Sequence, residues 1–162
     1  MPKLVKLGSS MPDLWTVIEA DAVPAAADIP DYALLPLTAY CELADQLSDK
    51  HGVWLNSDDD IAALENHIGT LPVIACRFTN FMDGRSFTQG RALREHYEFQ
   101  GALRALGSFI QDQMFFLLRC GFSEFSVADD ANYEELQQSL RDFSESYQAA
   151  RDVTQPLFRR RA

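Results

Sequence analysis

The residues that could do chemistry gather in one stretch, residues 78–121. Two carboxylates in it, Asp83 and Asp112, could act as a general acid and a general base, although nothing in the sequence fixes their separation. Residues 77–107 contain five Arg and three acidic residues, although the formal net charge of the whole chain is -10. A locally positive segment in an acidic protein favours a small anionic ligand. Its candidate binding residues are Arg85, Arg91, Arg94, Arg104, Ser108 and Gln113.

The same residues also have a structural interpretation. Asp83 and Gly84 are typical of a turn, in which Asp83 caps the next helix and pairs with Arg85. Two further arginines have the i,i+4 spacing of surface ion pairs with a glutamate: Arg91 with Glu95, and Arg94 with Glu98. Both interpretations remain open at the level of sequence.

Arg104 stands in the middle of an apolar run, between Leu103 and Ala105. A guanidinium buried there must have a partner, and Asp83 and Asp112 are the nearest candidates in the expected fold. Arg104 is therefore either part of a buried structural ion pair or a residue that faces the ligand.

No catalytic or cofactor motif accompanies these residues. The sequence contains no GxSxG, no P-loop and no GxGxxG, so we expect no cofactor. The three Cys residues are widely spaced and the three His residues lack ligand spacing, so we expect buried thiols and neither a disulfide framework nor a metal site.

The elements that must position the site follow from the apolar pattern. Strand and helix alternate about four times, which predicts an α/β fold of βα units in a parallel sheet or a half-barrel. Ligands of such folds bind beyond the carboxyl ends of the strands, so residues 80–85 and Ser108 should meet at one edge. Helices starting at Ser86 and Ser108 would point their N-termini there. The expected strands are 52–56, 71–78, 102–106 and 122–127, and the expected helices 61–68, 87–97, 109–120 and 133–149.

The remaining segments flank this βα-repeat domain, which we place at residues 33–152 and which also includes a helix after Pro36. Residues 1–32 contain two β-prone runs, 3–7 and 14–20, that suggest an N-terminal β-hairpin. Residues 153–162 form a basic tail that ends in three Arg before the last Ala. Because an open sheet edge invites pairing with another chain, we expect a homodimer.

Composition excludes several classes of function. The net charge of -10 argues against nucleic acid as a partner, since binding to a duplex needs Lys and Arg against its phosphates. No apolar run approaches the roughly 18 residues of a membrane span, and the first residues lack the apolar core of a secretory signal. We therefore expect a cytoplasmic protein with no membrane partner.

Several motifs in order carry a family resemblance. They are DGRSFTQGRALRE from Asp83, GALRALGSFIQDQMFFLLRCGFSEF from Gly101, LLPL at 34–37 and GVWLNSDDD at 52–60. This set resembles a bacterial family that is often encoded beside assimilatory sulfite reductase and labelled as oxidoreductases of sulfite reduction. The family's recurrent polar positions match Asp83, Arg85, Arg91, Arg94, Arg104, Asp112 and Gln113. The chain departs from the family where Thr79-Asn80, Ala102 and Ser108 replace Pro-Lys, an acid and Asp.

The resemblance implies a place in sulfur assimilation. The first hypothesis is an accessory protein of sulfite reduction that binds a small anionic ligand and docks to sulfite reductase or a related enzyme. One alternative is a cofactor-independent acid/base enzyme of lyase or isomerase type, in which Asp83 or Asp112 moves the proton. Another is a structural adaptor that uses the Arg-rich tail.

Overall fold

One mixed sheet organises the protein. The structure is a computed structural model that describes residues 3–80, 82–128 and 130–140. In these ranges eight strands follow the order β2-β1-β8-β7-β6-β5-β4-β3. Neighbours from β3 to β8 are parallel, whereas β1 pairs antiparallel with both β2 and β8. The strands are β1 (Lys3–Lys6), β2 (Ser9–Pro12), β3 (Thr16–Val17), β4 (Ala33–Pro36), β5 (Gly52–Leu55), β6 (Val73–Phe78), β7 (Ala102–Gly107) and β8 (Glu124–Val127).

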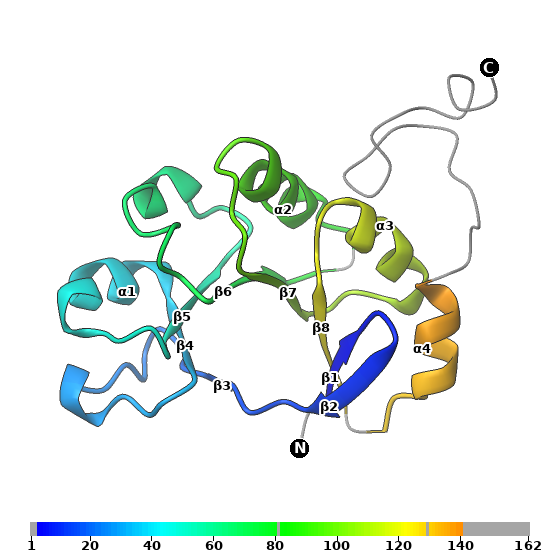
Figure 1. The fold of residues 1–162 in the computed structure, drawn as a ribbon, viewed down its shortest axis with the longest axis horizontal. Coiled ribbons are helices and arrows are strands. Elements are labelled where there is room, and N and C mark those ends of the chain that lie inside the picture. Colours follow the sequence, from blue (N-terminus) through cyan, green and yellow to red (C-terminus); the bar gives the residue numbers. More distant parts are fainter. Residues whose placement is uncertain (1–2, 81, 129, 141–162) are drawn as a thin grey trace.

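The sheet curves into a half-barrel, which confirms the α/β fold expected from the sequence (Figure 1). Helices line its outer side, and the segment that joins β2 to β3 runs along its inner side (Figure 1). The α-helices are α1 (Leu37–Leu43), α2 (Arg85–Glu95), α3 (Met114–Arg119) and α4 (Tyr133–Ser139). Short 3-10 turns are η1 (Ala26–Asp28), η2 (Ala44–Gln46), η3 (Ile61–Leu64) and η4 (Gln111–Gln113).

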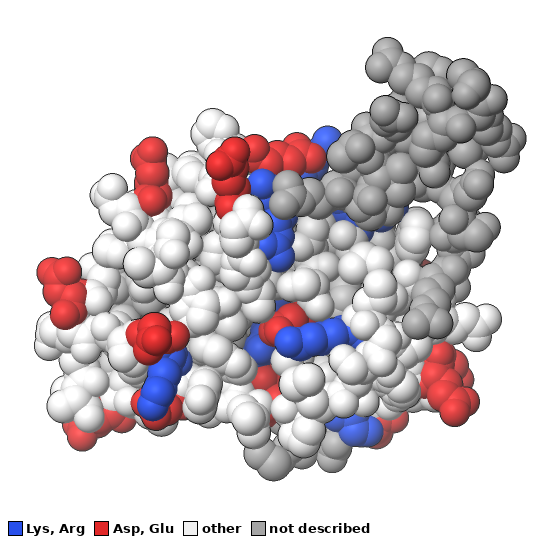
Figure 2. Space-filling view, in the orientation of Figure 1, with Lys and Arg blue, Asp and Glu red and all other residues white. Residues whose placement is uncertain are grey.

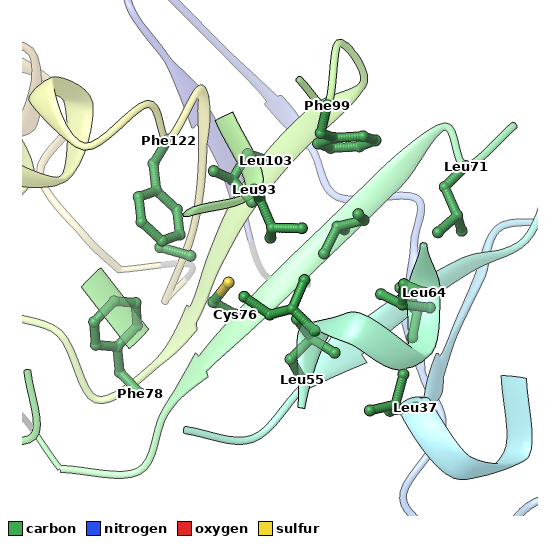
Figure 3. Close-up of a cluster of buried hydrophobic side chains, with 14 of the residues drawn as sticks. Leu37, Leu55, Leu64, Leu71, Cys76, Phe78, Leu93, Phe99, Leu103 and Phe122 are labelled. Atoms are coloured by element: carbon green, nitrogen blue, oxygen red, sulfur yellow. The ribbon is translucent and has the colours of Figure 1, made fainter. Parts of the chain in front are cut away.

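Alternate residues of each strand face opposite sides of the sheet, and two apolar clusters result. The larger cluster fills the space between the strands and the helices, where Leu55, Cys76 and Leu103 meet Leu93 of α2 (Figure 3). The smaller cluster lies on the inner side and consists of Leu34, Trp54, Val73, Ala75 and Leu106, with Trp15 packed against it. Both faces of the central strands are therefore buried, as their continuous apolar runs require.

The N-terminal hairpin exists, but its second strand is not the one that the sequence suggested. Gly8, at φ +84°, lies in a two-residue turn between β1 and β2, so the hairpin closes at once. The run at 14–20 contributes only β3, which pairs parallel with β4 at the opposite end of the sheet. The β-prone residues of that run are used instead to cover the inner face.

The repeat from residue 52 onward follows the expected order, with two differences in detail. The expected helix 61–68 is reduced to η3, and the expected helix 109–120 begins later, as η4 followed by α3. Strand β4 was not expected, because it is short and ends at Pro36. Helix α4 is described only to Ser139, and the basic tail lies outside the described residues.

The hairpin also changes the argument for a homodimer. Strand β1 covers the free side of β8, so the outermost strands of the described sheet are β2 and β3. The homodimer therefore stays a prediction, but the long open sheet edge from which we predicted it is absent from the described sheet. None of the helices in the described ranges has the length and apolar character that a membrane crossing requires.

Candidate functional site

Helix α2, which carries several of the predicted residues, is fixed to the sheet at its first turns. The hydroxyl of Ser86 is buried and donates to the carbonyl of Arg77 in β6, at 3.0 Å. Gln89 Nε2 donates to the carbonyls of Asn56 and Asp59, which follow β5, at 2.7 and 3.1 Å. The start of α2 therefore lies at the carboxyl ends of β5 and β6.

The segments that follow β5, β6 and β7 converge there, as parallel strands predict, and we call this region the carboxyl edge. Ser57 Oγ donates to Asp83 Oδ2 at 2.8 Å, which joins the segment after β5 to the segment after β6. The amide of Ser108 donates to the carbonyl of Phe78 at 2.7 Å, which joins the segments after β6 and β7.

Asp83 and Arg85 form a pair at the carboxyl edge. Arg85 donates to the Asp83 carboxylate through Nε, at 3.0 Å, and through Nη2, at 2.8 Å, and its amide donates to Asp83 Oδ1 at 3.1 Å. These bonds from Arg85, with the hydroxyl of Ser57, hold the pKa of Asp83 well below its usual range. Asp83 is therefore ionised and a weak base, whereas the Arg85 side chain stays 62% exposed.

The other predicted residues of this edge do not join the pair. Arg91 forms the expected surface ion pair with Glu95, at 2.9 Å. Gln113 Oε1 accepts from the amide of Ile110, so Gln113, rather than Ser108, caps the turn that precedes α3. Asp112 is exposed in η4, and no hydrogen bond or ion pair in the described ranges links it to Asp83.

Arg94 is a structural residue and not the surface partner of Glu98 that its spacing suggested. Its side chain is buried and donates to the carbonyls of Phe99, Gly101 and Gly121. Gly121 has φ +100°, and a Cβ there would lie 2.4 Å from Arg94 Cγ. The positive φ and the close approach explain why glycine occupies that position.

Arg104 points to the inner face of the half-barrel, where its partners differ from those predicted. Its Nη2 donates to Glu124 Oε2 at 2.7 Å and its Nη1 donates to Asp13 Oδ1 at 2.9 Å. The three side chains are 1–6% exposed, so the group is a buried ion-pair network. Asp83 and Asp112 follow the carboxyl ends of the strands and are not its partners.

Polar residues that the sequence analysis missed surround Arg104. Lys6 Nζ lies 2.6 Å from Glu124 Oε1, and Ser126 Oγ donates to Asp13 Oδ2 at 3.2 Å. Alternation along β8 places Glu124 and Ser126 on one face, but nothing in the sequence aligns Asp13 with β7.

A second ion pair lies on the same face. Arg77 stacks on Trp54, with 4.0 Å between its guanidinium carbon and the ring centroid, and donates to both carboxylate oxygens of Glu19. These bonds lower the pKa of Glu19. Arg104 and Arg77 are thus each matched by an acid of the N-terminal segment, Asp13 before β3 and Glu19 after it.

The three thiols lack the setting of a nucleophile. Burial raises the pKa of Cys76 to about 12, and it also raises the pKa values of Cys41 and Cys120. Each thiol is therefore protonated near neutral pH and inert as a nucleophile.

Exposed apolar side chains lie on the segments that follow β6 and β7. Met82 immediately precedes the pair in the chain and is 77% exposed, while Ile110 is 45% and Phe116 54% exposed. A series of ring contacts runs beneath them, from Phe109 through Phe78 and Phe87 to Phe116. On the face that Figure 2 shows, basic and acidic side chains are interleaved and form no single basic patch.

A comparison with models of protein families identifies the family of this chain. The sequence model of the bacterial proteins of unknown function called DUF934 matches residues 52–158. The chain belongs to this family. No curated protein matches it. The DUF934 region begins at β5 and contains Asp83, Arg85, Arg104 and Glu124, whereas Asp13 lies in the part that precedes it.

The buried network predicts a large loss of stability when its cation is removed. Arg104→Met removes the guanidinium that Asp13 and Glu124 share and leaves these buried acids with Ser126 and Lys6, so we expect the free energy of unfolding in urea to fall by about 3 kcal/mol. Arg77→Met is the control, because it removes an arginine of the same face whose acid partner is 54% exposed, and its loss should be smaller. Adding Glu124→Gln to Arg104→Met should restore part of the loss. Equal losses in the two single variants would contradict a network whose importance comes from burial.

The Asp83–Arg85 pair predicts a specific dependence on pH. The pKa of Asp83 in the folded protein is below its unfolded value of about 4, so its ionised form stabilises the fold above that pH and the contribution disappears as the pH falls. The difference in unfolding free energy between wild type and Asp83→Asn should therefore shrink from pH 6 to pH 3. Arg85→Gln should show the same decrease, and a difference that is constant over this range would show that the pair does not stabilise the fold.

Proposed function

We propose that this protein is a non-catalytic accessory protein of sulfite reduction, which docks to a reductase through its carboxyl edge and binds a small anion at Arg85. The observation that carries the proposal is the exposure of apolar side chains on the segments after β6 and β7, the first of which leads into Arg85. We call Met82, Arg85, Ile110 and Phe116 the docking surface. Surfaces that bind proteins are enriched in Met, aromatic residues and Arg, which is the composition found here.

The side chains that pack beneath the docking surface favour binding to a protein. Phe87 contacts both Phe78 and Phe116, with ring centroids 5.1 Å apart in each case, so the exposed Phe116 is continuous with the buried core. A side chain held in this way loses little conformational freedom when a partner covers it, which raises its contribution to binding. Exposed apolar groups that cluster beside an arginine are also the usual centre of an interface.

The geometry of Arg85 suits a small oxyanion at the same place. Asp83 holds the guanidinium through Nε and Nη2, and Nη1 makes no hydrogen bond to any residue that the structure describes. An arginine oriented by one carboxylate can present its remaining donors to sulfite, sulfate or phosphate. Asp58 also lies near Arg85 and weakens the attraction of an anion, so the partner's own charges would have to contribute.

The proposed role in sulfite reduction comes from the family resemblance of the motifs around Asp83 and Gly101. The fold neither supports this role nor argues against it. The lowered pKa of Asp83 counts against the acid/base enzyme, because a general base works best with a pKa near the working pH. The structural adaptor depends on the basic tail, residues 153–162, which lies outside the described residues. The homodimer and the cytoplasmic location stay part of the proposal.

The docking surface is tested by binding to purified sulfite reductase. Met82→Glu places a charge on an exposed apolar position and should weaken the complex by about tenfold or more in a biosensor titration. Leu14→Glu is the matched control, since Leu14 is 69% exposed on the segment that joins β2 to β3 and is not part of the docking surface, and it should leave the affinity unchanged. Equal affinities of the two variants would move the interface elsewhere, and no binding by wild type would remove the reductase from the proposal.

The anion site is tested separately by thermal unfolding with sulfite, sulfate and phosphate. Wild type should gain stability with at least one of these anions, because ligand binding to the folded state raises the unfolding temperature. Arg85→Gln should abolish the gain, whereas Arg91→Gln should keep it. The two arginines are matched, with side chains 62% and 61% exposed and one carboxylate partner each. A gain that survives in Arg85→Gln would place the anion elsewhere.

A further inference from the structure

A cavity lies at the end of the half-barrel opposite to the carboxyl edge. Its volume is about 460 Å³, which is within the range of sites for small molecules. Two segments line it: residues 65–71, which precede β6, and residues 96–101, which join α2 to β7. In Figure 3 the lining residues Leu71 and Phe99 lie near one end of β6, and Phe78 lies at the other end. The cavity is therefore separate from the docking surface.

The lining combines an apolar floor with acidic walls. Ile68, Leu71 and Phe99 are buried and form the apolar part, while Glu65 and Glu98 are exposed at the rim. Neither carboxylate makes an ion pair or a hydrogen bond with any residue in the described ranges. Two carboxylates without partners beside a hydrophobic floor create a negative potential in a partly desolvated space.

The surroundings strengthen this potential. His96 ends α2, so the negative end of the helix dipole faces the cavity. Arg94 lies 5.3 Å from the centre of the Phe99 ring and donates to the carbonyls of Phe99 and Gly101. Among the described residues it forms no ion pair with Glu65 or Glu98. The net charge of -10 adds a general attraction for cations.

The backbone at Glu98 has an uncommon conformation for a residue with a side chain. Glu98 has φ +53°, in the left-handed region that residues with a side chain adopt only at a cost. It follows the end of α2, where glycine is the residue most often found in this conformation. Glu98 is also a lining residue of the cavity, and its side chain is exposed at the rim.

We propose that this cavity binds an organic cation, namely a primary ammonium or a guanidinium on a short aliphatic chain. Glu65 and Glu98 would pair with the charged group, and the methylene groups would lie on Ile68, Leu71 and Phe99. The rings of Tyr97 and His96, which pack edge to face with centroids 4.9 Å apart, provide aromatic surface for the cation. A bare Mg²⁺ or Ca²⁺ ion fits less well, because these ions require six or more oxygen ligands. The site goes beyond the proposed function and does not depend on it.

Calorimetric titration of the full chain tests the site. The probes are 1,5-diaminopentane and agmatine as free amines, and Nα-acetyl-lysine methylamide as the side chain of a protein partner. Wild type should bind at least one of them, and the tighter class identifies whether the natural ligand is a free metabolite or a lysine of another protein. Glu98→Gln and Glu65→Gln should each weaken binding by about two- to fivefold, since each removes one exposed charge from the rim of the cavity.

Matched variants separate this site from a general attraction to an acidic protein. Glu42→Gln removes one negative charge from the exposed surface of α1 and should bind like wild type. Glu98→Gly should fold at least as stably as wild type, because glycine adopts φ +53° readily, and yet bind as weakly as Glu98→Gln. The proposal is overturned if wild type binds none of the probes, or if Glu98→Gln and Glu42→Gln have equal affinities. It is also overturned if Glu98→Gly binds like wild type. Displacement of the amines by 1 mM Mg²⁺, whose ionic effect roughly equals that of a few mM NaCl, would overturn it as well.

Discussion

The buried guanidinium of Arg104 is the point on which the inner side of the half-barrel depends. It connects β7 to β8 through Glu124, and both strands to the N-terminal segment through Asp13. Arginine fits this task because its planar fork of donors can satisfy two acids in different directions while staying charged. A buried ion pair adds little net stability compared with an apolar replacement, but it permits few other arrangements of the segments that it joins. We infer that its main effect is to fix how the N-terminal segment lies on the sheet.

The curved sheet separates the molecule into regions with different chemistry. The charges of the inner side are compensated within the fold, because Arg104 and Arg77 each pair with an acid of the N-terminal segment. The carboxyl edge carries an oriented arginine next to exposed apolar side chains, while the amino ends carry a cavity with uncompensated carboxylates. Charged groups that are buried with their partners have structural roles. The exposed groups, which are the Arg85 guanidinium and the carboxylates at the rim of the cavity, are the ones left to interact with other molecules.

The order of strands and helices from β5 onward was predictable from the sequence, because each element has a continuous apolar run and a boundary residue such as Gly69, Gly101 or Gly121. The meeting of the segments after β6 and β7 followed from the geometry of parallel sheets. The roles of the arginines were not predictable. Arg94 and Arg91 have the same spacing to a glutamate, but one of them binds carbonyls in the core and the other a surface acid. Which face of a helix is buried decides between these outcomes, and local spacing does not encode it.

The pairing of β1 with β8 has a consequence for how the chain folds. Lys3, Leu4 and Val5 contact residues 125–127, and Asp13 meets Arg104 across 91 positions in sequence. The entropy of closing such long loops must be overcome before these contacts form, which slows folding. During synthesis the hairpin and the segment up to Glu19 must wait, without their partners, until β7 and β8 have left the ribosome. The inner face is therefore completed late, and until then Trp15 and Trp54 would be open to solvent and to chaperones.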